Sequence, residues 1–247
     1  MMYLTETNLL AITKKQITFK LKANLFSLLS LLLLQGLAFL FSLNGVGQMG
    51  TGGNAISLTV KSFSGNLILF FSIFWAFCAA IIFTTKPYRY IDFSFVSNRV
   101  SSHLSTIATL AVYSLFASVT AMFAGVLLRV YMYFKFGSEN IIADHFLLSI
   151  PELCLGIYIG FLYILLFAMF GYIIGMFVQL NKLFAFVIPA LLIGWAYIEG
   201  KNVNTFSAIS FFLDETSILI FTIKILTIVA ALGTLVISAT NRMEVRR

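Results

Sequence analysis

Residues 153–177 read LCLGIYIGFLYILLFAMFGYIIGMF, a run without a single charged side chain. A helix needs about 20 apolar residues to cross the hydrocarbon core of a bilayer, and this run exceeds that length. Lipid offers no hydrogen-bond partner to the backbone, so a segment surrounded by it must satisfy its own N–H and C=O groups as a helix. The run therefore predicts a transmembrane helix.

Similar apolar runs recur along the chain and predict an all-α membrane protein with six transmembrane helices. The expected spans are 24–43, 66–84, 104–128, 153–177, 183–198 and 217–237. The fifth is short and contains Pro189, which favours a kink or a half-membrane helix there. The first is longer than the apolar core of a signal peptide, so we expect it to stay uncleaved. The transmembrane domain would cover 23–240 and a cytoplasmic tail 241–247.

The composition agrees with a lipid environment, because 60% of the 247 residues are hydrophobic and only 10% are charged. Soluble domains carry about a quarter charged residues. The net charge of +7 comes from short basic clusters beside the apolar runs, as in juxtamembrane anchors, so no nucleic-acid partner is expected. His103 and His145 are too few for a multi-histidine metal site, and Cys78 and Cys154 lie in apolar runs as small hydrophobes. No cofactor or metal is predicted.

The basic residues also predict the orientation, because Lys and Arg favour the cytoplasmic side. With the N-terminus inside, eleven fall on cytoplasmic segments: Lys14, Lys15, Lys20, Lys22, Lys86, Arg89, Arg99, Lys182, Arg242, Arg246 and Arg247. Four fall outside: Lys61, Arg129, Lys135 and Lys201. We therefore expect a multi-pass protein of the cytoplasmic membrane with both termini in the cytoplasm.

The stretch before the first span, Thr5–Lys22 (domain 5–22), predicts an interfacial amphipathic entry helix. Its apolar residues fall within a 200° arc at 100° per residue, and Lys14, Lys15 and Lys22 fall outside that arc, although Lys20 breaks the pattern. Such a helix would lie along the inner membrane surface. The alternative is a frayed polar leader.

No catalytic residues are expected, because no span has an Asp, Glu or His in its middle and the glycine-rich stretch 45–53 lacks the Lys of a phosphate-binding loop. Lys224 is the one charge well inside a span, roughly 10 Å from its start. An intramembrane charge is a candidate pathway residue. The alternative is an anchor whose stem extends outward or pairs with Asp214 or Glu215.

The fourth span carries two G-x-x-x-G pairs, formed by Gly156, Gly160, Gly171 and Gly175. At 100° per residue all four lie within one 100° arc, where another helix can approach closely. This helix-packing face would contact either another span of the same chain or a second subunit.

The segment between the second and third spans mixes aromatic and charged residues, which suits a protein-docking surface. The candidate docking residues are Tyr88, Tyr90, Ile91, Asp92, Phe93 and Arg99. The alternative is an interfacial segment whose aromatic rings lie among the lipid headgroups.

Taken together, these features resemble the permease subunit of ABC-2 type transporters. The matching features are the basic entry helix, the six spans, the internal termini, the Tyr/Phe/Arg-bearing loop with Ser97–Ser102 and the polar segment 199–215. The resemblance is to the small permeases of Gram-positive bacteria that export peptides or confer immunity to them, including exporters of phenol-soluble modulins, bacteriocins and other antimicrobial peptides. It implies that residues 88–102 include a coupling helix that docks on a separate cytoplasmic ABC ATPase. It also implies pairing with a second permease, as a homodimer or heterodimer, and no enzymatic activity in this chain.

Two alternatives differ in class. A non-transporting membrane subunit for immunity or assembly needs no pathway. A secondary transporter normally shows titratable groups at the midplane and an internal repeat, and neither is evident in the sequence. An ATPase that copurifies with the chain would separate the permease from both.

Overall fold

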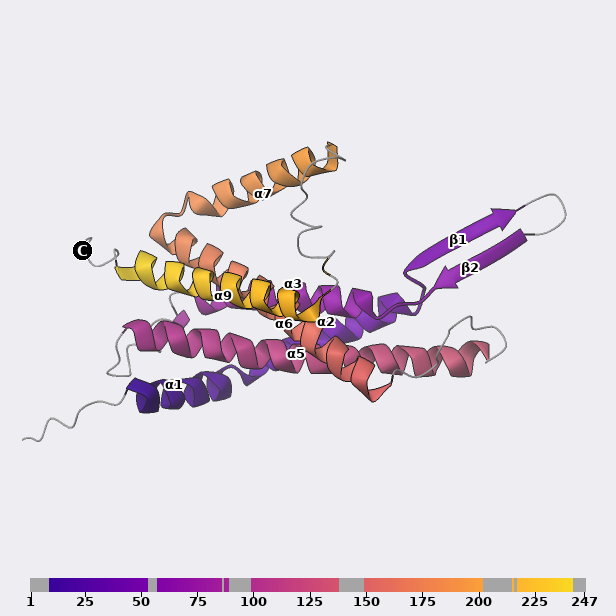
Figure 1. Ribbon diagram of the computed structural model, residues 1–247, viewed down its shortest axis with the longest axis horizontal. Helices are drawn as coiled ribbons and strands as arrows, with labels where there is room; N and C mark the ends of the chain where they lie inside the picture. Colours follow the sequence, from indigo (N-terminus) through magenta and orange to yellow (C-terminus); the bar gives the residue numbers. More distant parts are fainter. Residues whose placement is uncertain are drawn as a thin grey trace, which may run out of the picture. The chain divides into compact units, whose positions relative to one another are not determined.

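The computed structural model describes the chain over residues 9–52, 57–85, 87–88, 99–137, 149–201, 215 and 217–241 (Figure 1). Most of these residues are helical. The helices are α1 (Leu9–Ala23), α2 (Leu25–Ser42), α3 (Asn66–Phe83), α5 (Arg99–Phe136), α6 (Ile150–Leu180), α7 (Phe184–Lys201) and α9 (Ile218–Asn241). The strands are β1 (Gly47–Gly52) and β2 (Ser57–Ser62).

Within the described ranges, five helices are long and apolar enough to cross a membrane. They are α2, α3, nearly all of α5 and α6, and most of α9. Their side chains also remain largely accessible, as expected for helices whose outer surface faces lipid rather than water. The predicted class is confirmed: the chain is a multi-pass, all-α membrane protein.

The fifth expected span, 183–198, differs from the other five. It falls on α7, whose apolar part Phe184–Trp195 is shorter than a bilayer-crossing helix. Pro189 lies inside this helix, where it lacks the N–H of a helical hydrogen bond. Large side chains on α7 are exposed, for example Phe186 at 79% and Leu191 at 67%. A sixth crossing therefore stays a prediction.

Helix α5 is much longer than the span expected at 104–128, because it begins at Arg99 and continues to Phe136 over 38 residues. No proline interrupts α5, and helix propagation adds one hydrogen bond for each further residue. The next residue, Gly137, has a left-handed φ of +73°, and its N–H donates to the Tyr133 carbonyl at 3.0 Å. This is a glycine C-cap of the αL type.

The region after α2, which includes the glycine-rich stretch 45–53, contains two paired antiparallel strands that the sequence did not predict. Figure 1 shows β1 and β2 as two antiparallel arrows. In the register of this pair, Gly47 lies opposite Ser62 and Gly52 opposite Ser57. Gly45, at φ +93°, turns the chain into β1, and the N–H of Val46 donates to the Ser62 carbonyl at 2.8 Å. The β2 sequence SLTVKS alternates polar and β-branched or apolar residues, a pattern of strands. Glycine is uncommon in strands, so the glycine-rich composition of β1 gave no indication of this pairing.

The chain divides into two compact units. The first comprises Met1–Phe19, Phe77–Ala108 and Ala168–Arg247, and the second comprises Lys20–Ala76 and Thr109–Phe167. The helices α1, α3, α5 and α6 each contribute residues to both units.

The second unit holds α2, the first part of α3 and most of α5 together around small residues. Ala38, Ile68 and Ala121 are buried, and Phe39 and Leu69 are among the side chains that pack against them. Small side chains let apolar helices approach each other in lipid, where no hydrophobic force drives them together.

Candidate functional site

The predicted docking segment is described at its two ends. Tyr88 follows α3, donates its N–H to the Thr85 carbonyl at 3.1 Å, and packs its ring on Phe83 with the ring centroids 5.3 Å apart. Arg99 is the first residue of α5. The other candidates lie outside the described residues: Tyr90, Ile91, Asp92 and Phe93. The segment thus joins the ends of two helices that are long enough to span the membrane.

Helix α5 begins in a group of buried polar side chains within the first unit. Ser101 is 3% exposed and its hydroxyl donates to Oε1 of Gln16 on α1 at 3.0 Å. His103 is 8% exposed, and its Nδ1 lies 2.7 Å from the hydroxyl of Tyr172 on α6. The first turns of α5 are therefore hydrogen-bonded to two other helices, α1 and α6.

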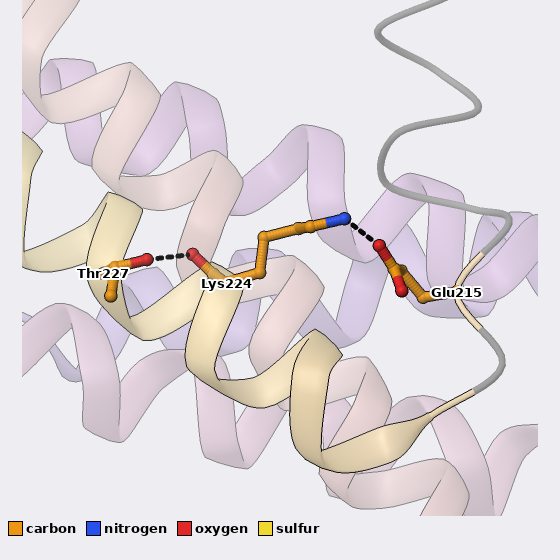
Figure 2. Close-up of polar contacts among 3 residues, drawn as sticks. All are labelled: Glu215, Lys224 and Thr227. Carbon is orange, nitrogen blue, oxygen red and sulfur yellow. Dashed lines mark hydrogen bonds and ion pairs between the residues drawn. The ribbon is translucent and has the colours of Figure 1, made fainter.

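Lys224 lies on α9 and forms an ion pair with Glu215, as Figure 2 shows. Lys224 is 14% exposed and Glu215 is 26% exposed, so both charges are mostly withdrawn from solvent. Asp214, the other predicted partner, lies outside the described residues. The backbone carbonyl of Lys224 accepts a hydrogen bond from the hydroxyl of Thr227 at 2.8 Å (Figure 2).

Of the two alternatives for Lys224, this geometry favours the anchor paired with a carboxylate over the pathway residue. Glu215 precedes the first residue of α9, Ile218, so the lysine stem extends toward the start of its own helix. A partly buried lysine paired with a carboxylate avoids the high cost of an isolated charge in an apolar environment.

Each of the four glycines of α6 faces another part of the same chain. In the second unit, a side chain at Gly156 would meet Met122, and one at Gly160 would lie 2.7 Å from the Ser118 hydroxyl and 3.2 Å from Leu69. Both positions allow close approach to α5, which is the geometry expected of a small-residue face.

In the first unit, the other two glycines allow equally close approach to the α3 side. A Cβ at Gly171 would collide with the backbone carbonyl of Phe77, and one at Gly175 would collide with Thr84. Across both units, the glycine face is thus occupied by segments of this chain.

The most instructive residue that the sequence analysis missed is Gln35. It is 4% exposed in α2, and its Nε2 donates to the Ser72 hydroxyl at 2.9 Å and to the Ala117 carbonyl at 3.1 Å. One amide thereby connects α2 with α3 and α5. The available signal was that Gln35 is the only amide in the apolar run 25–42, where a buried polar group requires partners.

Nearby hydrogen bonds extend the same pattern within the second unit. Trp75 donates its indole N–H to the Ser30 hydroxyl at 2.9 Å, and Ser118 donates to the Ile157 carbonyl at 2.6 Å. Polar groups buried in lipid-facing bundles need such internal partners, because no water is available to them.

Metal chemistry finds no support in the described part of the chain, where no three His, Cys, Asp or Glu side chains gather. Cys78 and Cys154 are free thiols. The Cys154 side chain is exposed and that of Cys78 is partly buried.

Comparison of the chain with protein-family models, with curated proteins and with solved structures finds no match.

Proposed function

We propose that this chain is the membrane-spanning permease subunit of an ATP-driven, ABC-type exporter. It would form half of a translocation pathway for an amphipathic peptide in the cytoplasmic membrane, with both termini inside. A second copy or a related permease would supply the other half, and a separate cytoplasmic subunit would hydrolyse ATP.

The observation that carries the proposal is the position of the docking segment between α3 and α5. Tyr88 packs against the end of α3, and the segment leads directly into Arg99 at the start of α5. A protein bound to this segment pushes on two long apolar helices at once. The lack of a phosphate-binding loop in the sequence agrees with an ATPase on a different chain.

The proposed mechanism follows from the polar contacts at the start of α5. Closure of the ATPase on ATP would displace the docking segment and, with it, the first turns of α5. Ser101 and His103 would carry that displacement to α1 and α6, because each is hydrogen-bonded to a side chain of one of those helices. Rocking of helices against one another would then open the pathway.

The test is purification of the tagged full-length chain from its native membranes, followed by identification of copurified proteins that bind ATP. The proposal predicts a soluble ATPase with Walker motifs. Tyr88→Ala should reduce its recovery several-fold, since a well-packed interface anchor contributes more than about 1 kcal/mol. The matched control is Tyr131→Ala, which removes a 42% exposed tyrosine near the other end of α5.

A membrane-inserted chain that recovers no ATP-binding protein would contradict the permease assignment and favour the immunity or assembly subunit. Equal recovery from Tyr88→Ala and Tyr131→Ala would contradict the docking role of the segment while leaving the ATPase partnership intact.

A further inference from the structure

The side of α1 that packs against protein is polar. Thr13 is 6% exposed and Gln16 is fully buried, and both contact Ser101 of α5 through hydrogen bonds of 3.1 and 3.0 Å. The sequence predicted an amphipathic helix along the inner membrane surface and did not predict these contacts with α5. The hydrogen bonds to Ser101 determine the rotation of α1 about its axis.

This rotation turns a basic surface outward. At 100° per residue, Lys14 and Thr18 each project about 160° from Gln16, one to either side, so that they lie only about 40° apart on the helix surface. Lys15 projects about 100° from Gln16. Lys14, Lys15 and Thr18 are exposed, and Phe19, at the edge of this surface about 40° from Lys15 and about 60° from Gln16, is 42% exposed. The sequence of α1, LLAITKKQITFKLKA, contains no acidic residue that would neutralise the lysines.

The position of α1 in the chain brings this surface to a membrane boundary. The helix ends at Ala23 and the candidate span α2 starts at Leu25, so a single residue separates them. Lysines in that position extend their ammonium groups to the headgroup layer, and an exposed Phe among them adds apolar contact with the upper acyl chains.

We propose that the outer face of α1, formed by Lys14, Lys15, Thr18 and Phe19, binds the headgroups of anionic phospholipids. The charge of the face complements a phosphodiester headgroup with no compensating amine, such as that of phosphatidylglycerol. Because the opposite face of α1 is hydrogen-bonded to Ser101, bound lipid holds the start of α5 in place. The proposal is independent of whether the chain transports a substrate.

The experiment uses the full-length protein in detergent micelles and measures binding of phosphatidylglycerol and of phosphatidylcholine by native mass spectrometry at low and high salt. Each lysine near an anionic surface strengthens binding by about five-fold, so Lys14→Gln/Lys15→Gln should lose roughly 25-fold of the preference for phosphatidylglycerol. High salt should weaken the wild-type preference, because it screens exposed charges.

Two matched variants make the result specific to this face. Lys14→Arg/Lys15→Arg keeps the charge and should keep the preference, which also separates charge from folding. Lys61→Gln removes an exposed lysine on β2 and should change nothing. Equal binding of both lipids to the wild type, an unchanged preference in Lys14→Gln/Lys15→Gln, or an equal loss in Lys61→Gln would each overturn the proposal.

Discussion

At the scale of single residues, the ion pair between Lys224 and Glu215 shows how a charge is kept in an apolar helix. Both side chains are mostly buried, at 14% and 26% exposed. Glu215→Gln leaves the lysine without its counter-charge and should lower the free energy of unfolding by about 2 kcal/mol, less than for a fully buried pair. Thermal unfolding in detergent measures this loss.

The double variant Lys224→Met/Glu215→Gln serves as the control for that prediction. Removing both charges should restore most of the stability, since the cost arises from the unpaired partner rather than from the missing contact. A loss of stability in the double variant equal to the sum of the losses in Lys224→Met and Glu215→Gln would contradict an energetic coupling between the two residues.

Gln35 is the second informative residue, because its amide donates to groups on two other helices. Gln35→Leu keeps the volume and removes both hydrogen bonds. Interhelical hydrogen bonds in membranes contribute about 0.6 kcal/mol each, so we expect a loss of about 1 kcal/mol in detergent unfolding. The control Gln48→Leu makes the same change at an exposed position of β1 and should be neutral. Equal melting of the two variants would show that the cross-link carries no stability.

At the scale of secondary-structure elements, the glycines of α6 differ in what surrounds them. Gly171 faces the rigid backbone of Phe77, whereas Gly160 faces the movable hydroxyl of Ser118. Gly171→Ala should therefore destabilise the protein by about 1–3 kcal/mol, the typical cost of overpacking, and Gly160→Ala by less. Melting temperature and the yield of folded protein measure both effects.

Gly36 on α2 provides the matched control, since a Cβ there meets nothing within 4 Å. Gly36→Ala should be neutral or stabilise the helix by up to about 1 kcal/mol, because alanine is the better helix former. The close packing of α3 and α6 at Gly171 would be contradicted by a melting temperature for Gly171→Ala that matches that of Gly36→Ala.

At the scale of the whole molecule, the number of crossings determines which segments share a side of the membrane. Three long apolar helices, α3, α5 and α6, lie between Lys61 and Lys182, so the two lysines should be on opposite sides. After Cys78 and Cys154 are replaced, an impermeant maleimide should label Lys61→Cys in intact cells. Lys182→Cys should react only after permeabilisation.

A cysteine at Met243 tests whether α7 crosses the membrane. Crossing by both α7 and α9 places Met243 on the same side as Lys182, whereas an α7 that lies along the surface places it on the opposite side. The six-span topology predicts that Met243→Cys stays unlabelled in intact cells. Labelling there would establish five crossings.

The sequence by itself determined the class of this protein and the positions of five membrane helices. Local hydropathy suffices for that, because lipid excludes every backbone conformation that leaves N–H and C=O groups unpaired. The runs around 24–43 and 153–177 needed no information from distant parts of the chain. Hydropathy was least informative at 183–198, because a proline and a short apolar run fit either a membrane crossing or a helix along the membrane surface.

The tertiary structure alone decided the partners of the polar groups. Gln35 contacts residues 37 and 82 positions away, and Ser101 contacts α1 from 85 positions away. A single Gln or Ser hardly changes the hydropathy of its run, so nothing local identifies its partner. The rotation of α1 also depends on such contacts, because Thr13 and Gln16 are hydrogen-bonded to the buried Ser101. Pairing across space, rather than composition along the chain, determined which faces of the helices are buried.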